Sequence, residues 1–200
     1  MGTRAPLAIR WPGKIKAGKK VSDYITLGHL APTFLEIAGI EVPDDMRFTS
    51  IMDVLLSRRS GKIRSDLDAV YTSIETHCGR YPMRAVQTGE YLYIKNYEPE
   101  RPINQCKKYW ETAAGYSPTW VEINRLDKSD PIYQRVDGKR PSEELYYLPE
   151  DPFQLNNLAA DPDYSEALEY MRNRLVNEQI ETQDPRYLGT YKEVFYPGKE

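Results

Sequence analysis

The sequence has few of the residues that mark several common classes of protein. Its two cysteines, Cys78 and Cys106, are too few for a disulfide framework and do not stand at a spacing typical of metal ligands. A net charge of -3 gives no general attraction to nucleic acid or to an anionic membrane surface. No apolar run approaches the length that spans a bilayer, and the first residues do not form a signal peptide. What remains is a chain of 200 residues, which suits one domain, or one domain and a small second one.

Phenylalanine is also scarce, with four residues, whereas the chain has sixteen tyrosines and three tryptophans. Tyrosine and tryptophan join an apolar body to a polar group, so they suit half-buried sheet faces and sugar-contacting clefts alike. We prefer the structural explanation, because aromatic residues are frequent in strands. Contact with a sugar stays open as the alternative.

The most organised stretch of the sequence covers residues 144–159. Apolar side chains fall on both faces of residues 145–148, which predicts a strand covered on both sides. Pro152 ends the strand, because proline cannot donate to a ladder, and Asn156 and Asn157 are placed to cap turns and helix ends. The stretch therefore predicts a strand, a turn and the entry to a helix, and it suggests no chemistry by itself.

The first part of the chain contains a strand and a helix that need partners. Residues 7–11 are a short apolar run that predicts a strand. Apolar side chains at helical spacing predict a helix within residues 21–39, and a short helical piece follows at residues 51–56. A lone strand followed by a helix needs neighbours in a parallel sheet, and the rest of the sequence offers none. We therefore expect that the N-terminal side of the molecule is missing. The apolar residues of the helix are Leu30, Phe34, Ile37 and Ala38.

A basic loop, residues 14–20, separates that strand from that helix. Its four lysines could attract an anionic ligand, but a solvated loop is the interpretation that we prefer.

The middle of the chain predicts antiparallel strands. Residues 69–74 are rich in β-branched and aromatic side chains, which is typical of a strand. Residues 82–88 and 91–96 predict a hairpin, and we expect Gly89 to supply a positive φ in its short loop.

A long segment and a long helix complete the chain. Residues 99–138 look irregular, with one or two helical turns at residues 120–126. Asp161-Pro162 predicts the start of the last helix and Asp184-Pro185 its end, followed by a frayed polar tail. Antiparallel strands covered by a long terminal helix make an α+β arrangement. The apolar stripe expected on this helix is Leu168, Met171 and Leu175.

Residues 75–80 have more chemically reactive or charged types of side chain close together than any other part of the sequence. A carboxylate, an imidazole, a thiol and a guanidinium follow the end of a predicted strand, where sites are common on α/β scaffolds. A functional site and an ordinary polar loop are equally good explanations. The four side chains are those of Glu75, His77, Cys78 and Arg80.

Several short motifs together resemble the C-terminal third to half of a sulfatase. They occur in the order and rough spacing of that family and extend over nearly the whole chain. They are Arg10-Trp11-Pro12-Gly13-Lys14-Ile15, the run from Leu30 to Gly39, Glu144-Leu145-Tyr146, Asp151-Pro152 and Asn157-Leu158-Ala159. Two more resemble the N-sulfoglucosamine sulfohydrolase branch, the heparan N-sulfatases, more than the arylsulfatases. These are Tyr81-Pro82-Met83-Arg84-Ala85-Val86-Gln87 and Glu181-Thr182-Gln183-Asp184-Pro185.

The resemblance implies an alkaline-phosphatase-like fold that combines α/β and α+β parts. Residues 1–64 would be the end of the large N-terminal α/β domain, with its last strand-helix unit, and the connection that follows. Residues 65–200 would be the C-terminal subdomain, a small antiparallel four-stranded sheet packed on a long C-terminal helix.

The resemblance also implies a chemistry that this chain does not complete. The family uses a formylglycine, made from the first residue of a Cys/Ser-x-Pro-x-Arg motif, and a calcium ion held by carboxylates and an amide. Neither Cys78 nor Cys106 is followed by the proline and arginine of that motif. We expect no catalytic residue and no metal site in this chain, and calcium and formylglycine in the complete enzyme. The chain by itself is therefore predicted not to hydrolyse sulfate groups.

Four residues are carried over as candidates for substrate binding. Glu75 and His77 match an acidic-x-His pattern and are expected to hydrogen-bond hydroxyls or amines of a glucosamine. Arg84 is expected to have a structural role, pairing with a carboxylate across the domain boundary, with contact to the ligand as the alternative. Arg4 is expected to help bind an anionic group. His29 replaces the aspartate common at its helix start and suggests no function.

Two functions follow from the resemblance. In the first, the chain is a C-terminal fragment of a sulfatase that acts on glycosaminoglycan sugars, most closely N-sulfoglucosamine of heparan-type substrates, and its partner is the missing N-terminal domain. In the second, it is a stand-alone carbohydrate-binding or accessory module without the chemistry. Full-length members of the family are expected in the periplasm, in the lysosome or outside the cell.

Overall fold

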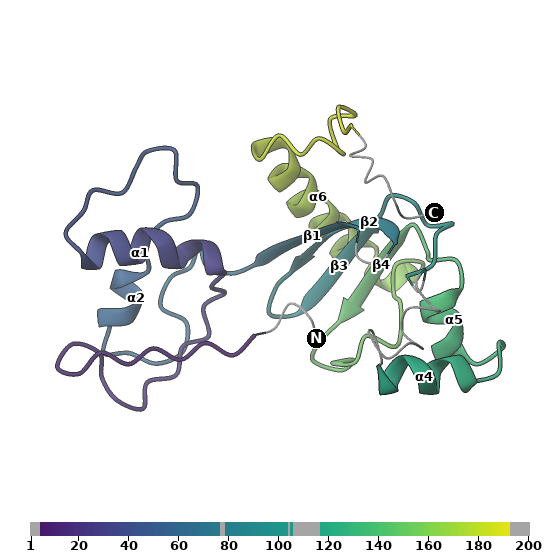
Figure 1. Ribbon diagram of the computed structural model, residues 1–200, viewed down its shortest axis with the longest axis horizontal. Helices are drawn as coiled ribbons and strands as arrows, with labels where there is room; N and C mark the ends of the chain where they lie inside the picture. The colour runs from purple at the N-terminus through teal and green to yellow at the C-terminus, as the bar shows by residue number, and fades with distance from the viewer. Residues whose placement is uncertain (1–4, 77–78, 104, 106–116, 193–200) are drawn as a thin grey trace. The chain divides into compact units, whose positions relative to one another are not determined.

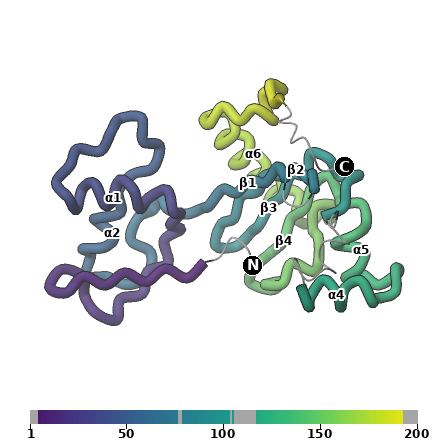
Figure 2. Tube along the Cα trace, in the orientation of Figure 1, coloured from purple at the N-terminus to yellow at the C-terminus, as the bar shows by residue number. Residues whose placement is uncertain are grey.

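The computed structural model describes residues 5–76, 79–103, 105 and 117–192. The chain divides into two compact units, residues 1–70 and 71–200 (Figures 1 and 2). The division predicted after residue 64 concerns the domains of a complete enzyme and stays a prediction. None of the helices in the described ranges combines the length and the apolar character that crossing a bilayer requires.

The first unit is built on short helices and one small core. It contains η1 (Leu27–His29), α1 (Leu30–Ile37) and α2 (Met52–Leu56), which confirms helices at both predicted places. Its buried core consists of Ile51, Val54, Leu55 and Leu67, against which Ile15, Val21, Ile25, Met52 and Ile63 pack.

Two expectations for the first unit are wrong in detail. Residues 7–11 are not a strand, because no strand of the described part pairs with them, and an extended segment becomes a strand only through such pairing. The predicted apolar face of α1 does not face the core, since Phe34 is 60% exposed. Thr33 is buried instead, because its hydroxyl donates to His29 O at 2.5 Å and accepts from Ile51 N at 3.0 Å. These bonds turn the polar side of α1 toward residue 51.

The second unit is a four-stranded sheet in the order β1-β2-β3-β4, with β2–β3 and β3–β4 antiparallel. Ala85 faces Ile94 in the first pair, and Tyr93 faces Leu145 in the second. Helix α6 packs on β2 and β3 (Figure 1), and Met171 and Leu175 of its predicted stripe are buried. The strands are β1 (Val70–Thr76), β2 (Arg80–Gln87), β3 (Tyr91–Asn96) and β4 (Glu143–Tyr147). The remaining elements are α4 (Pro118–Arg125), α5 (Pro131–Asp137), η2 (Pro162–Tyr164) and α6 (Ser165–Glu181).

The predicted β2–β3 hairpin forms, but its turn differs from the expected one. Gly89 does not have a positive φ. The side-chain oxygen of Thr88 accepts from the backbone N–H of Tyr91 at 3.0 Å, and Thr88 N–H donates to Tyr91 O at 2.9 Å. These bonds close the loop without a left-handed residue.

The stretch over residues 144–159 becomes a strand and a turn, and Asn157 extends the ladder of β4. Its side-chain oxygen accepts from Leu145 N at 2.9 Å, and its side-chain nitrogen donates to Glu143 O at 3.1 Å. Leu145 is completely buried. The long helix begins later than the stretch itself, at Ser165, after Asp161 caps η2 by accepting from Asp163 N at 3.0 Å.

Candidate functional site

The end of β1 and the middle of β2 place Glu75 beside Arg84. Arg84 is buried and binds Asp184 with two nitrogens, Nε to Oδ2 at 2.5 Å and Nη2 to Oδ1 at 3.1 Å. Its Nη2 also donates to Glu75 Oε1 at 2.7 Å. Its Nη1 donates to two backbone carbonyls, Met83 O at 3.0 Å and Ile74 O at 3.4 Å. All five N–H groups of Arg84 are therefore directed to acceptors within the second unit.

Arg186 binds the other side of Glu75. Its Nε and Nη2 donate to Glu75 Oε2 at 2.9 and 2.7 Å, and its guanidinium lies 4.0 Å from the ring centre of Tyr191. Its Nη1 reaches Glu98 Oε1 at 3.4 Å. The segment after Asp184 is therefore attached to the sheet as far as this tyrosine, so the tail is not frayed directly after the helix, and residues 193–200 lie outside the described residues.

Two more arginines share Glu98. Arg80 Nε donates to its Oε1 at 2.9 Å, and Arg101 Nε pairs with its Oε2 at 2.8 Å. The whole set is called the arginine–carboxylate network below, and it has one more cation than anions. Its members are Glu75, Arg80, Arg84, Glu98, Arg101, Asp184 and Arg186.

The end of α6 brings Asp184 to the sheet. Gln183 has a positive φ of 51°, which reverses the chain directly after the helix. Asp184 N then donates to Gln179 O at 2.8 Å, and Arg186 N donates to Asp184 Oδ1 at 2.9 Å. The side chain of Gln179 is buried and donates to Tyr97 OH at 2.6 Å.

The network favours the ionised forms of Glu75 and Asp184. Burial opposes the charge of Glu75, but hydrogen bonds from Arg186 and Arg84 outweigh it and lower the pKa of Glu75. Burial likewise opposes the charge of Asp184, and the hydrogen bond from Arg84 outweighs it and lowers the pKa of Asp184. The same two carboxylates outweigh the burial of Arg84 and raise the pKa of its guanidinium.

The structure brings two of the four predicted site residues together, Glu75 and Arg84. The other two, Arg4 and His77, lie outside the described residues, as do Cys78 and Cys106. The expected pairing of Arg84 with a carboxylate is found, within one unit, and its filled donors favour this structural role over the alternative, contact with the ligand.

Sequence reasoning did not connect Glu98, Asp184 or Arg186 with the predicted site. The run from Glu181 to Pro185 gave a signal, because it was one of the motifs that resembled the sulfohydrolase branch. A carboxylate directly after a helix end, within such a motif, is consistent with a buried partner elsewhere in the chain.

The described residues offer no set of side chains that fits the calcium ion of a sulfatase. They contain no group of three or more histidines, cysteines, aspartates or glutamates that could hold a metal ion. The three carboxylates of the network are bound by arginines.

Comparison with known proteins defines the class to which this fold belongs. The small antiparallel sheet with its long terminal helix is that of alkaline-phosphatase-like sulfatases. The structure of BT4656 in complex with its substrate D-glucosamine-2-N,6-O-disulfate has a TM-score of 0.61, with 23% identity over 88% of this chain and 28% of that one. At this identity the likeness shows the fold. A family model described as N-sulphoglucosamine sulphohydrolase, C-terminal, matches residues 1–106, and the chain belongs to this family.

Two curated relatives show how far the likeness extends. Human N-sulphoglucosamine sulphohydrolase is 29% identical over 196 residues, which cover 92% of this chain and 38% of the human protein. An ulvan-active sulfatase of Formosa agariphila is 30% identical over 165 residues, which cover 82% of this chain and 30% of that protein. The chain thus spans about a third of the length of these two curated relatives.

Proposed function

We propose that this chain is the C-terminal part of a sulfatase that removes sulfate from glycosaminoglycan sugars, and that it contributes recognition of the substrate and not the nucleophile. The observation that carries the proposal is the family match, whose range includes both Glu75 and His77. The absence of a Cys/Ser-x-Pro-x-Arg motif from the sequence assigns the reacting group to another part of the complete enzyme.

Glu75 has the geometry of a sugar-binding acceptor. Arg186 donates twice to its Oε2, whereas Oε1 receives one hydrogen bond, from Arg84. Oε1 therefore keeps a lone pair for a hydroxyl or an amine of the sugar. Arg84 acts as the residue that positions Glu75, while His77 and Arg4 are assigned to the sugar and to its anionic group.

N-sulfoglucosamine of a heparan-type chain is the substrate that we assign. The human relative named for that sugar covers 92% of the chain. The ulvan-active relative supports a different sulfated polysaccharide at nearly the same identity. Ulvan oligosaccharides are therefore the competing substrate in any test.

His77→Ala in the complete sulfatase that carries this chain tests the proposal. Loss of a hydrogen bond to a polar sugar group should lower kcat/KM for N-sulfoglucosamine roughly tenfold, with little change in melting temperature. Thr76→Ala, a change at the exposed neighbouring position, is the matched control and should leave kcat/KM within about twofold.

Two results would contradict the proposal. An unchanged kcat/KM in the His77→Ala enzyme would remove this residue from the site. Faster turnover of ulvan oligosaccharides than of N-sulfoglucosamine by the parent enzyme would replace the assigned substrate.

A stand-alone carbohydrate-binding or accessory module is the second candidate. It is favoured by the second unit, which has its own sheet, covering helix and buried ion pairs. Sulfate release by the complete enzyme, and none by the 200-residue chain with calcium added, would support the fragment. The module would be supported if the 200-residue protein is monodisperse and binds sulfated sugars. It would also be supported if the gene has a stop codon and a signal-peptide sequence upstream of Met1.

A further inference from the structure

Two basic runs of the sequence meet in the first unit. Residues 1–22 contain six Lys or Arg and no Asp or Glu, and residues 54–65 contain four Lys or Arg and again no acid. A parallel bridge between Val21 and Gly61 joins them, with Gly61 N donating to Lys20 O at 2.8 Å and Ser22 N to Gly61 O at 3.1 Å. The bridge therefore brings the end of the first basic run beside the second run.

Some of these cations stabilise the fold. Lys19 Nζ donates to the carbonyls of Val54, Leu55 and Ser57 at 2.6, 2.7 and 3.0 Å, so it caps the C-terminal end of α2. Arg64 pairs with Asp66 at 2.5 Å. These two charges are neutralised within the unit.

Six other cations of these two runs have side chains that make no hydrogen bond or ion pair with any residue in the described ranges. Arg10 is one of them, and the other five are called the basic face: Lys14, Lys16, Lys20, Arg58 and Lys62. Such a concentration of like charge raises the free energy of the folded unit unless an anionic partner binds.

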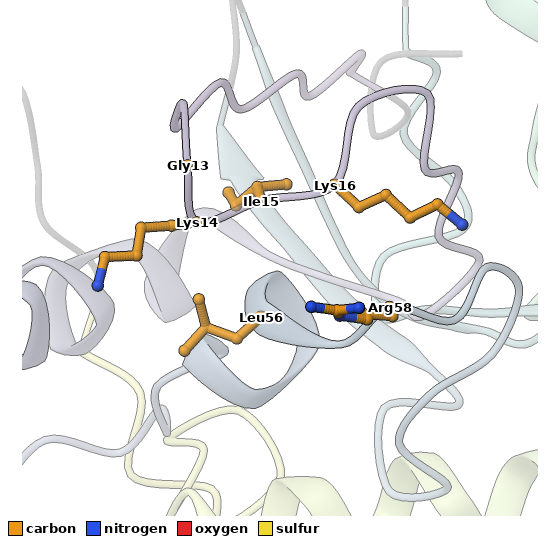
Figure 3. A pocket seen from close by; sticks show the side chains of 6 residues that line it. All are labelled: Gly13, Lys14, Ile15, Lys16, Leu56 and Arg58. Carbon is orange, nitrogen blue, oxygen red and sulfur yellow. The ribbon is translucent and has the colours of Figure 1, made fainter.

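Three members of the basic face line an open hollow of about 410 Å³, together with Gly13, Ile15 and Leu56 (Figure 3). Lys14 and Lys16 extend to opposite sides of Ile15, and Arg58 lies beside Leu56 (Figure 3). The cations flank the hollow and do not converge on one point. This arrangement suits a row of separate anionic groups better than a single small anion.

The apolar residues between the cations narrow the class of ligand. Leu56 is 44% exposed, although it belongs to α2, and Ile15 is half-buried beside it. Sugar rings offer C–H faces to such side chains, while their sulfate groups bind lysine and arginine. No aromatic side chain lines the hollow, so the stacking platform typical of sites for single-stranded nucleic acid is missing there.

We propose that the basic face binds the sulfate groups of a polysaccharide chain, with Lys14, Lys16 and Arg58 as its main contacts. This inference rests on the proposed function, which supplies a sulfated polymer as the ligand. It adds a binding surface in the first unit to the recognition residues assigned to the second. The loop of residues 14–20 is then a ligand-binding element and not only a solvated connection.

Binding of a fluorescently labelled heparin dodecasaccharide to the 200-residue chain tests the inference. The triple variant Lys14→Gln/Lys16→Gln/Arg58→Gln should bind about tenfold more weakly, because three exposed ion pairs of roughly 0.5 kcal/mol are lost. The affinity of the variant should also depend less steeply on salt concentration, because fewer counterions are displaced. Far-UV circular dichroism and the melting temperature should match those of the parent.

The control removes the same charge elsewhere. Arg125→Gln/Lys128→Gln/Lys139→Gln changes three exposed cations of the second unit and should keep the heparin affinity within about twofold. Equal weakening by both triple variants, parent-like binding by the first variant, or no binding of heparin by the parent would overturn the inference. Equally tight binding of a duplex DNA of similar charge would do so as well.

The proposed function has a separate readout. The His77→Ala enzyme is assayed by turnover of a single N-sulfated sugar, which does not need the basic face. Parent-like heparin binding by the Lys14/Lys16/Arg58 variant, beside a loss of turnover in His77→Ala, would refute the basic face alone. Unchanged turnover in His77→Ala, beside weakened heparin binding by the triple variant, would refute the recognition residues alone.

Discussion

Replacing Arg84 by methionine should destabilise the second unit strongly. The side chains of Arg84 and Asp184 are each only 10% exposed, and the guanidinium binds this aspartate and Glu75. Methionine has a similar length but no charge, so it leaves a buried carboxylate without its main partner. Breaking a buried pair in this way costs about 3–5 kcal/mol. For a unit of this size that corresponds to a fall in melting temperature of roughly 10 °C or more.

Urea denaturation followed by tryptophan fluorescence gives the free energy of unfolding. In a Trp11→Phe background the remaining tryptophans, Trp110 and Trp120, belong to residues 71–200, so the signal reports the second unit. Arg125→Met is the matched control, because Arg125 and its partner Glu122 are both 69% exposed. An exposed pair contributes at most about 1 kcal/mol, so the control should change little.

A double variant separates loss of the pair from loss of packing. Arg84→Met/Asp184→Leu removes the unpaired buried charge that the single variant leaves. It should therefore recover part of the lost free energy of unfolding, with a coupling of about 2 kcal/mol between the two sites. A loss below about 1 kcal/mol for Arg84→Met, or no recovery in the double variant, would refute this account of the network.

Two further predictions concern β4. Hydrogen bonds from Arg172, opposed by burial and assisted by Tyr93, lower the pKa of Glu143 to about 2. A lowered carboxyl pKa stabilises the folded state above the unfolded value of about 4.3, and this stability is lost as the pH falls toward 2. Glu143→Gln should therefore flatten the fall in melting temperature between about pH 4.5 and 2, and an unchanged profile would contradict the assignment. Asn157→Ala should cost about 1–2 kcal/mol in urea denaturation, because Leu145 N loses its acceptor, whereas a neutral effect would show that the side-chain extension of the ladder is dispensable.

Local patterns predicted most of the helices and strands. The β2–β3 hairpin and the burial of Met171 and Leu175 follow from periods of two and about 3.6 residues, which depend only on neighbours in the sequence. The helix α5 was missed within the long irregular segment, although Asp130-Pro131 is a start signal. The Asp130 side chain accepts from Ile132 N at 2.8 Å, and proline occupies the first turn.

Expectations failed where tertiary contacts outweighed the local pattern. The apolar face of α1 is exposed because the hydroxyl of Thr33 is bonded to residue 51. Gly89 needs no positive φ because the side chain of Thr88 closes the turn. In both cases a threonine hydroxyl satisfies backbone groups, an alternative that hydrophobic periodicity cannot detect.

The candidate site could be predicted only in part, for a reason that its geometry makes clear. Arg84 belongs to the Tyr81–Gln87 motif and Asp184 to the Glu181–Pro185 motif, and one hundred positions separate the two residues. In the sequence these are two separate short motifs that resemble the sulfohydrolase branch. In the fold, each motif supplies one partner of a single buried ion pair. Because Arg84 also binds Glu75, the end of α6 determines where the carboxylate at the end of β1 lies. The motifs are then expected to occur together wherever that carboxylate must be positioned, since either one alone would leave a buried charge unpaired.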